Sequence, residues 1–174
     1  MTDLSRIKRF EQKVLPHLDA AYNLARWLTR NDHDAEDVVQ EAYERALKFF
    51  DGFHGESARP WLLTIVRHTC YTWLQRNRPK EVTRVFDDET EAEKSESCAC
   101  TPETLLLQNA DRDRLNLAIE ALPLAFREVL ILRELEDLAY KEIATITDIP
   151  LGTVMSRLAR ARKLLRLSLA GDKK

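Results

Sequence analysis

Glycine, cysteine and long apolar runs are all scarce in this 174-residue chain. It has only 4 Gly, and stretches rich in Ala, Leu, Glu and Arg dominate, which favours helices over strands and turns. No segment approaches about 18 consecutive apolar residues, so we expect no membrane-spanning helix and no membrane contact of its own. The basic residues near the N-terminus precede no apolar block, which excludes a signal peptide. Three Cys are too few for a disulfide framework, which indicates the reducing cytoplasm.

The net charge is only −2, but the charges come in blocks of alternating sign. Residues 32–51 hold seven acidic side chains, and residues 81–103 hold eight. Residues 59–80 hold five basic side chains and no acid, and residues 150–174 hold seven basic side chains against one acid. Two basic segments favour a nucleic-acid partner, although charge alone is equally compatible with ordinary solvated helix faces.

The N-terminal half is predicted to form three helices. Apolar residues recur at helical spacing over residues 4–28, with Val14, Leu18 and Leu24 on one buried stripe. Polar residues at 31–34 supply capping oxygens for a second helix over about 34–50, which should bury either Phe49 or Phe50. A Gly-containing loop follows at 51–57, and a third helix extends from near Pro60 to about Arg76.

The acidic residues 80–102 lack helical periodicity and are predicted to form a flexible linker. It would separate an N-terminal domain, 1–79, from a C-terminal domain, 103–174. Helices in the second domain are expected at about 103–121, 124–135, 139–147 and 151–169. The predicted fold class is therefore all-α, with two small helical domains joined by a flexible acidic linker.

The last two of these helices have the pattern of a helix-turn-helix. Ala144 is small where the helices must cross, and Val154 follows ten positions later, as suits a DNA-reading pair. Asp148 stands at the turn position that needs a left-handed backbone, which Asp tolerates better than most residues. The second helix should expose a mixed base-reading and phosphate-binding set. A plain helical hairpin with a basic solvent face is the alternative.

Two segments together resemble a known family. The run LPLAFREVLILRELEDLAYKEIATITDIPLGTVMSRLARARKLL is similar to the promoter-binding C-terminal domain of extracytoplasmic-function (ECF) sigma factors of RNA polymerase. The run DAEDVVQEAYERALKFFDGFHGESARPWLLTIVRHTC resembles the N-terminal domain of the same family, which docks on polymerase and melts the promoter. Both resemblances in this order are far more specific than either alone.

The resemblance implies roles for individual residues in each domain. Core-polymerase binding would fall to Asp37, Gln40 and Glu41, although an acidic solvated face is the alternative for these three. Recognition of the −10 element, including capture of an unstacked base, would fall to Phe53, His54, Arg59, Trp61, Arg67 and His68. Contact with the −35 element would fall to Thr153, Met155, Ser156, Arg157, Ala159, Arg160 and Lys163.

The family implies a sigma factor that binds core RNA polymerase and directs promoter-specific initiation in the cytoplasm. Its partners would be core polymerase, promoter DNA (duplex at −35, single-stranded at −10) and an anti-sigma factor. No enzymatic activity, cofactor or metal is expected. The pair Cys98 and Cys100 could bind zinc or sense oxidants, but a lone Cys-x-Cys without further ligands is a weak signal.

Two other functions are compatible with parts of the sequence. A sigma-like module could titrate an anti-sigma protein without touching DNA, in which case its recognition helix should have lost its basic residues. A polymerase-independent regulator could use the helix-turn-helix alone, but it would leave the N-terminal resemblance unexplained.

Overall fold

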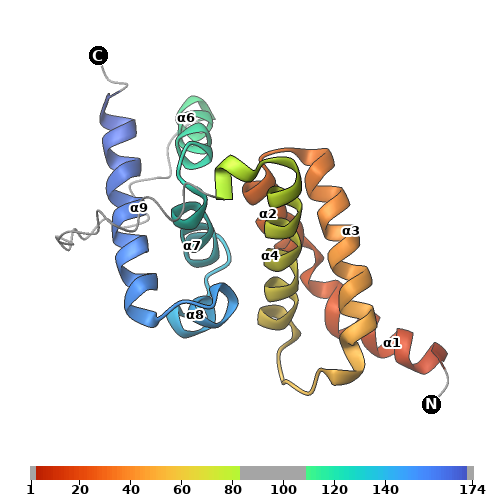
Figure 1. Ribbon diagram of the computed structural model, residues 1–174. Helices are drawn as coiled ribbons and strands as arrows, with labels where there is room; N and C mark the ends of the chain where they lie inside the picture. Colours follow the sequence, from red (N-terminus) through yellow and green to blue (C-terminus); the bar gives the residue numbers. More distant parts are fainter. Residues whose placement is uncertain (1–2, 83–108, 172–174) are drawn as a thin grey trace. The chain divides into compact units, whose positions relative to one another are not determined.

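A computed structural model describes residues 3–82 and 109–171, and throughout these residues the chain forms helices and turns without strands (Figure 1). In chain order the elements are α1 (Asp3–Val14), a 3-10 turn (Leu15–His17), α2 (Leu18–Thr29), α3 (Asp32–Phe49), a 3-10 turn (Phe50–Gly52), α4 (Ala58–Asn77), α6 (Asn109–Glu120), α7 (Leu124–Glu134), α8 (Tyr140–Thr147) and α9 (Leu151–Gly171). This confirms the all-α class. Among the described residues, none of the helices is both long enough and apolar enough to cross a bilayer.

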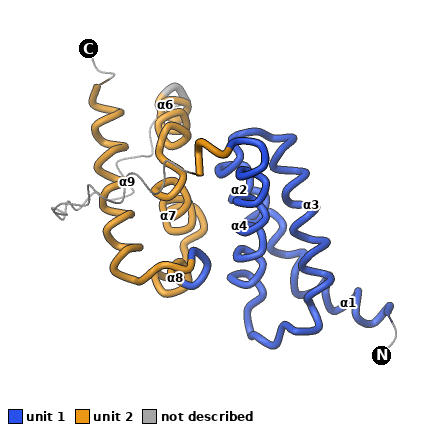
Figure 2. Tube along the Cα trace, viewed as in Figure 1, with its two compact units in different colours: residues 1–78, 145–147 blue, residues 79–144, 148–174 orange. Residues whose placement is uncertain are grey.

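The chain divides into two compact units (Figure 2). Unit 1 comprises residues 1–78 together with 145–147, and unit 2 comprises residues 79–144 and 148–174. The predicted linker, 80–102, falls mainly outside the described residues. Its first described residues, 80–82, belong to a helical segment that starts at Pro79. The exact domain limits of 1–79 and 103–174 stay a prediction.

The first predicted apolar stripe is interrupted at Pro16. A 3-10 turn over Leu15–His17 separates α1 from α2, with Pro16 in its first turn. Val14 and Leu24 are fully buried as expected, but Leu18 is 44% exposed, so its predicted place in the core is wrong. The reason is geometric: Leu18 and Leu24 both lie in α2, and six positions of an α-helix place their side chains about 120° apart, so they do not share a face.

Helix α3 begins where the capping pattern predicted. The side-chain oxygen of Asn31 accepts a hydrogen bond from the backbone N–H of Asp34 at 3.0 Å, which satisfies an otherwise orphaned donor. At the other end of the helix Phe50 is 1% exposed and Phe49 is 59% exposed. Phe50, outside the α-helix proper, is thus the aromatic residue that enters the core.

The core of unit 1 lies between α2, α3 and α4. These helices pack against one another through small and branched side chains that are fully buried, namely Ala21, Leu24, Ala25, Leu28, Val38, Ala42, Ala46, Leu62, Leu63, Val66 and Leu74. The many Ala residues let the helix axes approach closely. Several α4 hydroxyls are satisfied within their own helix: Thr64 and Thr69 each donate at 2.8 Å to the carbonyl four residues earlier.

Unit 2 is organised around α7, whose residues from Leu124 to Leu132 are all buried, and α7 packs mainly on α9. Arg127, although charged, is 2% exposed. Its guanidinium donates to the carbonyls of Glu120 at 3.0 Å and Leu122 at 2.9 Å, at the C-terminal end of α6. A buried cation is tolerated here because it satisfies carbonyls that the end of a helix leaves without partners.

We predict that Asn31→Ala lowers the free energy of unfolding of unit 1 by about 1 kcal/mol, because the cap of α3 is lost. All three Trp of the chain, at positions 27, 61 and 73, lie in unit 1, so Trp fluorescence during urea unfolding reports on that unit. The control is Gln75→Ala, an exposed change within α4 that should leave the midpoint unchanged. Equal midpoints for both variants would contradict the role of the cap.

Candidate nucleic-acid interface

The outer face of α3 carries the three residues predicted to bind polymerase. Asp37 and Gln40 are exposed, and Glu41 is half-buried. Glu41 accepts a hydrogen bond from Arg45 at 2.6 Å, an exposed i,i+4 ion pair of modest strength. The helix therefore presents these groups together on one side, as spacings of three and four require.

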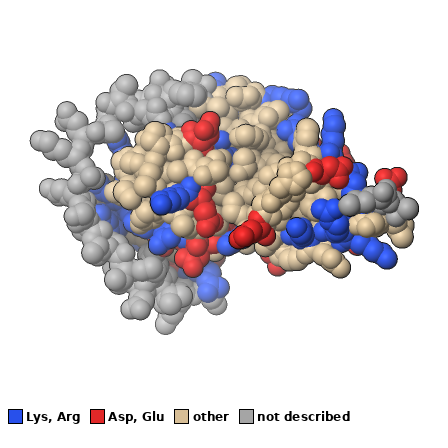
Figure 3. All heavy atoms as spheres, turned by 90° about the horizontal axis from the view of Figure 1, so that it is seen from below, with Lys and Arg blue, Asp and Glu red and all other residues tan. Residues whose placement is uncertain are grey.

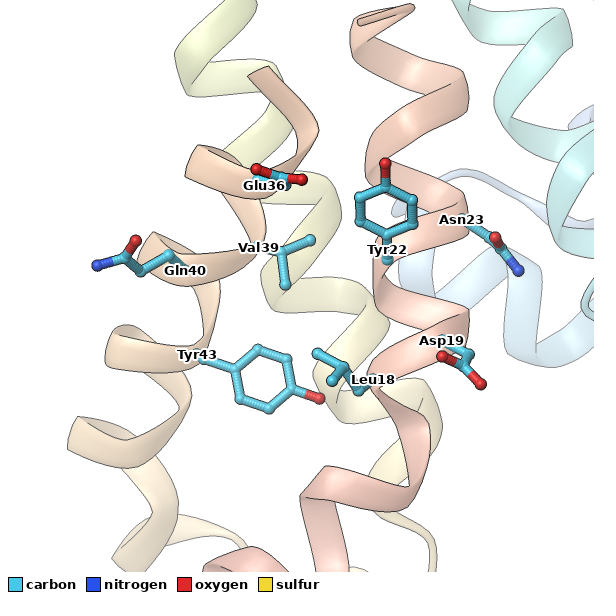
Figure 4. A pocket seen from close by; sticks show the side chains of 8 residues that line it. All are labelled: Leu18, Asp19, Tyr22, Asn23, Glu36, Val39, Gln40 and Tyr43. Atoms are coloured by element: carbon cyan, nitrogen blue, oxygen red, sulfur yellow. The ribbon is translucent and has the colours of Figure 1, made fainter. Parts of the chain in front are cut away.

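Beside this face lies a groove of about 610 Å³ between α2 and α3, which the sequence did not indicate (Figure 4). Its lining combines apolar and ring surfaces with acidic groups: Leu18, Asp19, Tyr22, Asn23, Glu36, Val39, Gln40 and Tyr43. At its floor, the Tyr43 hydroxyl donates to the carbonyl of Val14 at 3.3 Å. Burial, and then the charge of Asp19, raises the pKa of Tyr43 to about 12, so this hydroxyl stays protonated.

An aromatic cluster supports the loop between α3 and α4. Phe50 meets the ring of Phe10 edge-on at 5.4 Å and stacks near Phe53 at 6.4 Å. Phe53 in turn lies 4.8 Å from the ring of Trp61, which projects from the first turn of α4. A Cβ on Gly55 would come within 2.9 Å of the Phe53 ring, so the loop backbone closes directly over that ring. Such contacts fix ring positions as well as burying area.

The residues predicted to recognise the −10 element lie on this loop and on α4. Phe53 and Trp61 are half-buried against each other, and His54 is exposed at the tip. Arg59 is half-buried in the first turn of α4. Burial, and then the charge of Arg59, lowers the pKa of the His17 imidazole. Further along α4, the Arg67 guanidinium lies 4.2 Å from the centre of the Tyr71 ring, and His68 is exposed.

Two cations of α1 join the aromatic cluster, and nothing in the sequence pattern singled them out. The Lys13 ammonium lies 5.9 Å from the centre of the Phe53 ring, and the Arg9 guanidinium lies 5.6 Å from that of Phe50. Lys and Arg side chains gather beside the N-terminal end of the chain on the face seen in Figure 3. Basic and aromatic groups are therefore interleaved here, as in proteins that bind single strands.

The helix-turn-helix has the predicted turn. Asp148 adopts a left-handed backbone, with φ 54° and ψ 46°, directly after α8. Ile143 of α8 and Val154 of α9 are fully buried, and Leu158 is 1% exposed. Ile149, between the two helices, is only partly buried.

Helix α9 exposes three of the seven residues predicted to contact the −35 element. Met155 is 47% exposed, Ser156 and Lys163 are also exposed, and Thr153, Ala159 and Arg160 are half-buried. The exposure predicted for Arg157 is wrong, because its side chain is buried, at 8%. Arg160 lies 5.7 Å from the centre of the Phe126 ring, which orients its guanidinium. Arg162 forms an ion pair with Glu134 at 2.6 Å and so braces α9 against α7.

No cluster of three or more metal-ligating side chains occurs within residues 3–82 and 109–171. The pair Cys98 and Cys100 lies outside these ranges.

Both compact units match known families. Residues 14–80 match Sigma-70 region 2, and residues 112–165 match region 4 of the same family. The chain is 37% identical over 174 residues to the ECF RNA polymerase sigma-E factor of Escherichia coli K12, with 93% of this chain and 90% of that protein covered. It belongs to the ECF sigma factor family. The sigma factor SigE of Mycolicibacterium smegmatis is 29% identical, with 97% of this chain and 64% of that protein covered.

Two solved structures have a similar fold. The sigma factor RpoE of Bartonella quintana, in complex with the anti-sigma factor NepR, superposes with a TM-score of 0.71 at 28% identity, covering 95% of this chain and 99% of that one. CnrH, in complex with the cytosolic domain of CnrY, superposes with a TM-score of 0.68 at 23% identity, covering 95% of this chain and 90% of that one. At this lower identity, the similarity to CnrH shows only that the two proteins share a fold.

Proposed function

We propose that this ECF sigma factor binds core RNA polymerase and directs it to promoters through separate −10 and −35 contacts. The observation that supports this proposal most directly is that one chain contains two different units. One matches region 2 and has an aromatic loop, and the other matches region 4 and has a helix-turn-helix. It would bind promoter DNA and help to open it, and its role would be that of an initiation factor without catalysis of its own. That role belongs in the cytoplasm, with the polymerase.

In unit 1, the acidic face of α3 would dock on polymerase, while the loop and α4 would hold the non-template strand at −10. An aromatic surface with a close-lying backbone suits an unstacked base, because every base offers a π-face. Phe53 and Trp61 lie against each other at a tilt of 34°, so a captured base would stack between or beside these two rings. His54, Arg59, Arg67 and His68 would contact the adjoining backbone and bases.

In unit 2, α9 would enter the major groove at −35. Met155 and Ala159 donate no hydrogen bonds, so part of this element would be recognised through thymine methyl groups and DNA shape. Arg160, half-buried beside Phe126, would contact guanine acceptors. Thr153, Ser156 and Lys163 would support it. Arg157 would serve as a phosphate contact only after its buried side chain moves outward.

Two alternatives are disfavoured by particular observations. A module that only titrates an anti-sigma protein has no need for basic groups on its recognition helix, yet Lys163 is exposed there and Arg160 is partly so. A regulator acting through the helix-turn-helix alone has no need for the region 2 match over residues 14–80. The deciding experiment is run-off transcription with purified core polymerase on a promoter library, where no transcript from any promoter would refute the proposal.

We expect Asp37→Lys combined with Glu41→Lys to abolish binding to core polymerase without unfolding the chain. The face is exposed, so charge reversal replaces attraction by repulsion at little folding cost. A pull-down with core polymerase and circular dichroism measure the two effects. Asp3→Lys with Glu11→Lys on α1 is the charge-matched control, and equal recovery of both double variants would contradict the docking assignment.

Arg160→Ala and Lys163→Ala should differ in how they depend on the promoter. Loss of a guanine contact costs about 1–3 kcal/mol at one base pair, whereas loss of a phosphate contact weakens all sequences alike and lowers the salt slope by about one unit. Transcription from templates with each −35 base changed in turn distinguishes these outcomes. If Arg160→Ala lowers transcription from all templates by the same factor, Arg160 contacts the DNA phosphates and not a base.

An anti-sigma factor should hold the protein inactive by covering its DNA-binding surfaces, since the solved RpoE relative is bound to one. Co-expression with the product of a neighbouring reading frame, followed by size-exclusion chromatography, should yield a complex that does not support run-off transcription. A neighbour that co-purifies but leaves transcription unchanged would argue against this mode of control.

A further inference from the structure

We propose that α1, which lies almost entirely before the region 2 match, forms a second wall of the −10 strand site, with Lys13 binding a phosphate of the captured strand. The inference rests on the proposed −10 function and adds to it a contact from a helix outside the residues assigned above. Residues 14–80 match region 2, so Lys13 stands one position before that match.

Helix α1 is fixed to the base of the loop by contacts that span the unit. Arg6 donates to Asp51 at 3.0 Å and to the carbonyl of Leu47 at 2.6 Å, at the end of α3. Phe10 packs edge-on against both Phe50 and Tyr43. These ties hold α1 in one place relative to the loop, so the cations on its inner edge have defined positions.

Those positions suit a strand whose base stacks on the aromatic cluster. Lys13 is exposed, and its ammonium stands 5.9 Å from the centre of the Phe53 ring. A nucleotide places its phosphate beside its base, so a cation next to the stacking ring meets the backbone of that same strand. Asp51, an acid at the start of the loop, is already paired with Arg6.

The charge environment favours one strand over a duplex or an acidic peptide. Arg9 lies over Phe50 on the same edge of α1, about one helical turn from Lys13. Two cations of α1 thus lie against the aromatic cluster. A duplex offers no free base face to the rings, and an acidic peptide brings no nucleobase to stack on them.

The test compares Lys13→Ala with Lys8→Ala in holoenzyme reconstituted from the full chain and core polymerase. Lys8 is also exposed on α1, but five positions of helical rotation place it about 140° away, so it controls for net charge. Both DNA probes come from one promoter, which is selected by run-off transcription with the wild-type chain. The first probe is a fork whose −10 non-template strand is single-stranded. The second probe is the −35 duplex of the same promoter.

Loss of one single-strand phosphate contact makes the negative slope of log K against log salt less steep by about 0.7. This corresponds to about fivefold weaker binding at 0.1 M salt. We expect this change on the fork for Lys13→Ala, full affinity for Lys8→Ala, and restored affinity for Lys13→Arg. Equal fork affinities and salt slopes for Lys13→Ala and Lys8→Ala overturn the inference. Failure of the wild-type chain to support any run-off would instead refute the proposed function, so the two failures are distinguishable.

Discussion

The arrangement of unit 1 depends on the packing of one side chain, Phe50. Its ring is almost fully buried and contacts Phe10 from α1, Phe53 from the loop and Trp61 from α4, at centre-to-centre distances of 5.4 to 6.4 Å. An aromatic side chain that links so many elements contributes several kcal/mol, and truncation to Ala in such cores costs about 3–5 kcal/mol. The loop that would hold a melted base is therefore supported from below by the hydrophobic core.

The two candidate DNA surfaces are supported in different ways. The loop of unit 1 has few backbone hydrogen bonds and takes its shape from ring packing. The recognition helix of unit 2 is tied to α7 by the ion pair of Arg162 with Glu134, and its residues Val154 and Leu158 are buried. A site that must admit an unstacked base needs rings that can move, whereas readout of a duplex groove needs a fixed helix.

Much of the fold could be predicted because local rules and tertiary structure agree. The capping oxygen of Asn31 and the left-handed turn at Asp148 are local, and both are confirmed. The family resemblance, not residue chemistry, suggested Asp37, Gln40 and Glu41, and their role stays a prediction. What pattern could not show depends on contacts distant in sequence: the burial of Arg157 and the approach of Lys13 to Phe53.

The tie between Arg6 and Asp51 joins residues 45 positions apart. During synthesis the chain emerges from the ribosome N-terminus first, so α1 is complete well before its anchoring carboxylate and the Phe50 ring exist outside the exit tunnel. Until then its apolar side, including Phe10 and Val14, has no core to cover. Helix α1 is thus translated first among the elements of unit 1 but can dock only once the loop has been made, and in this interval it is open to chaperones and proteases.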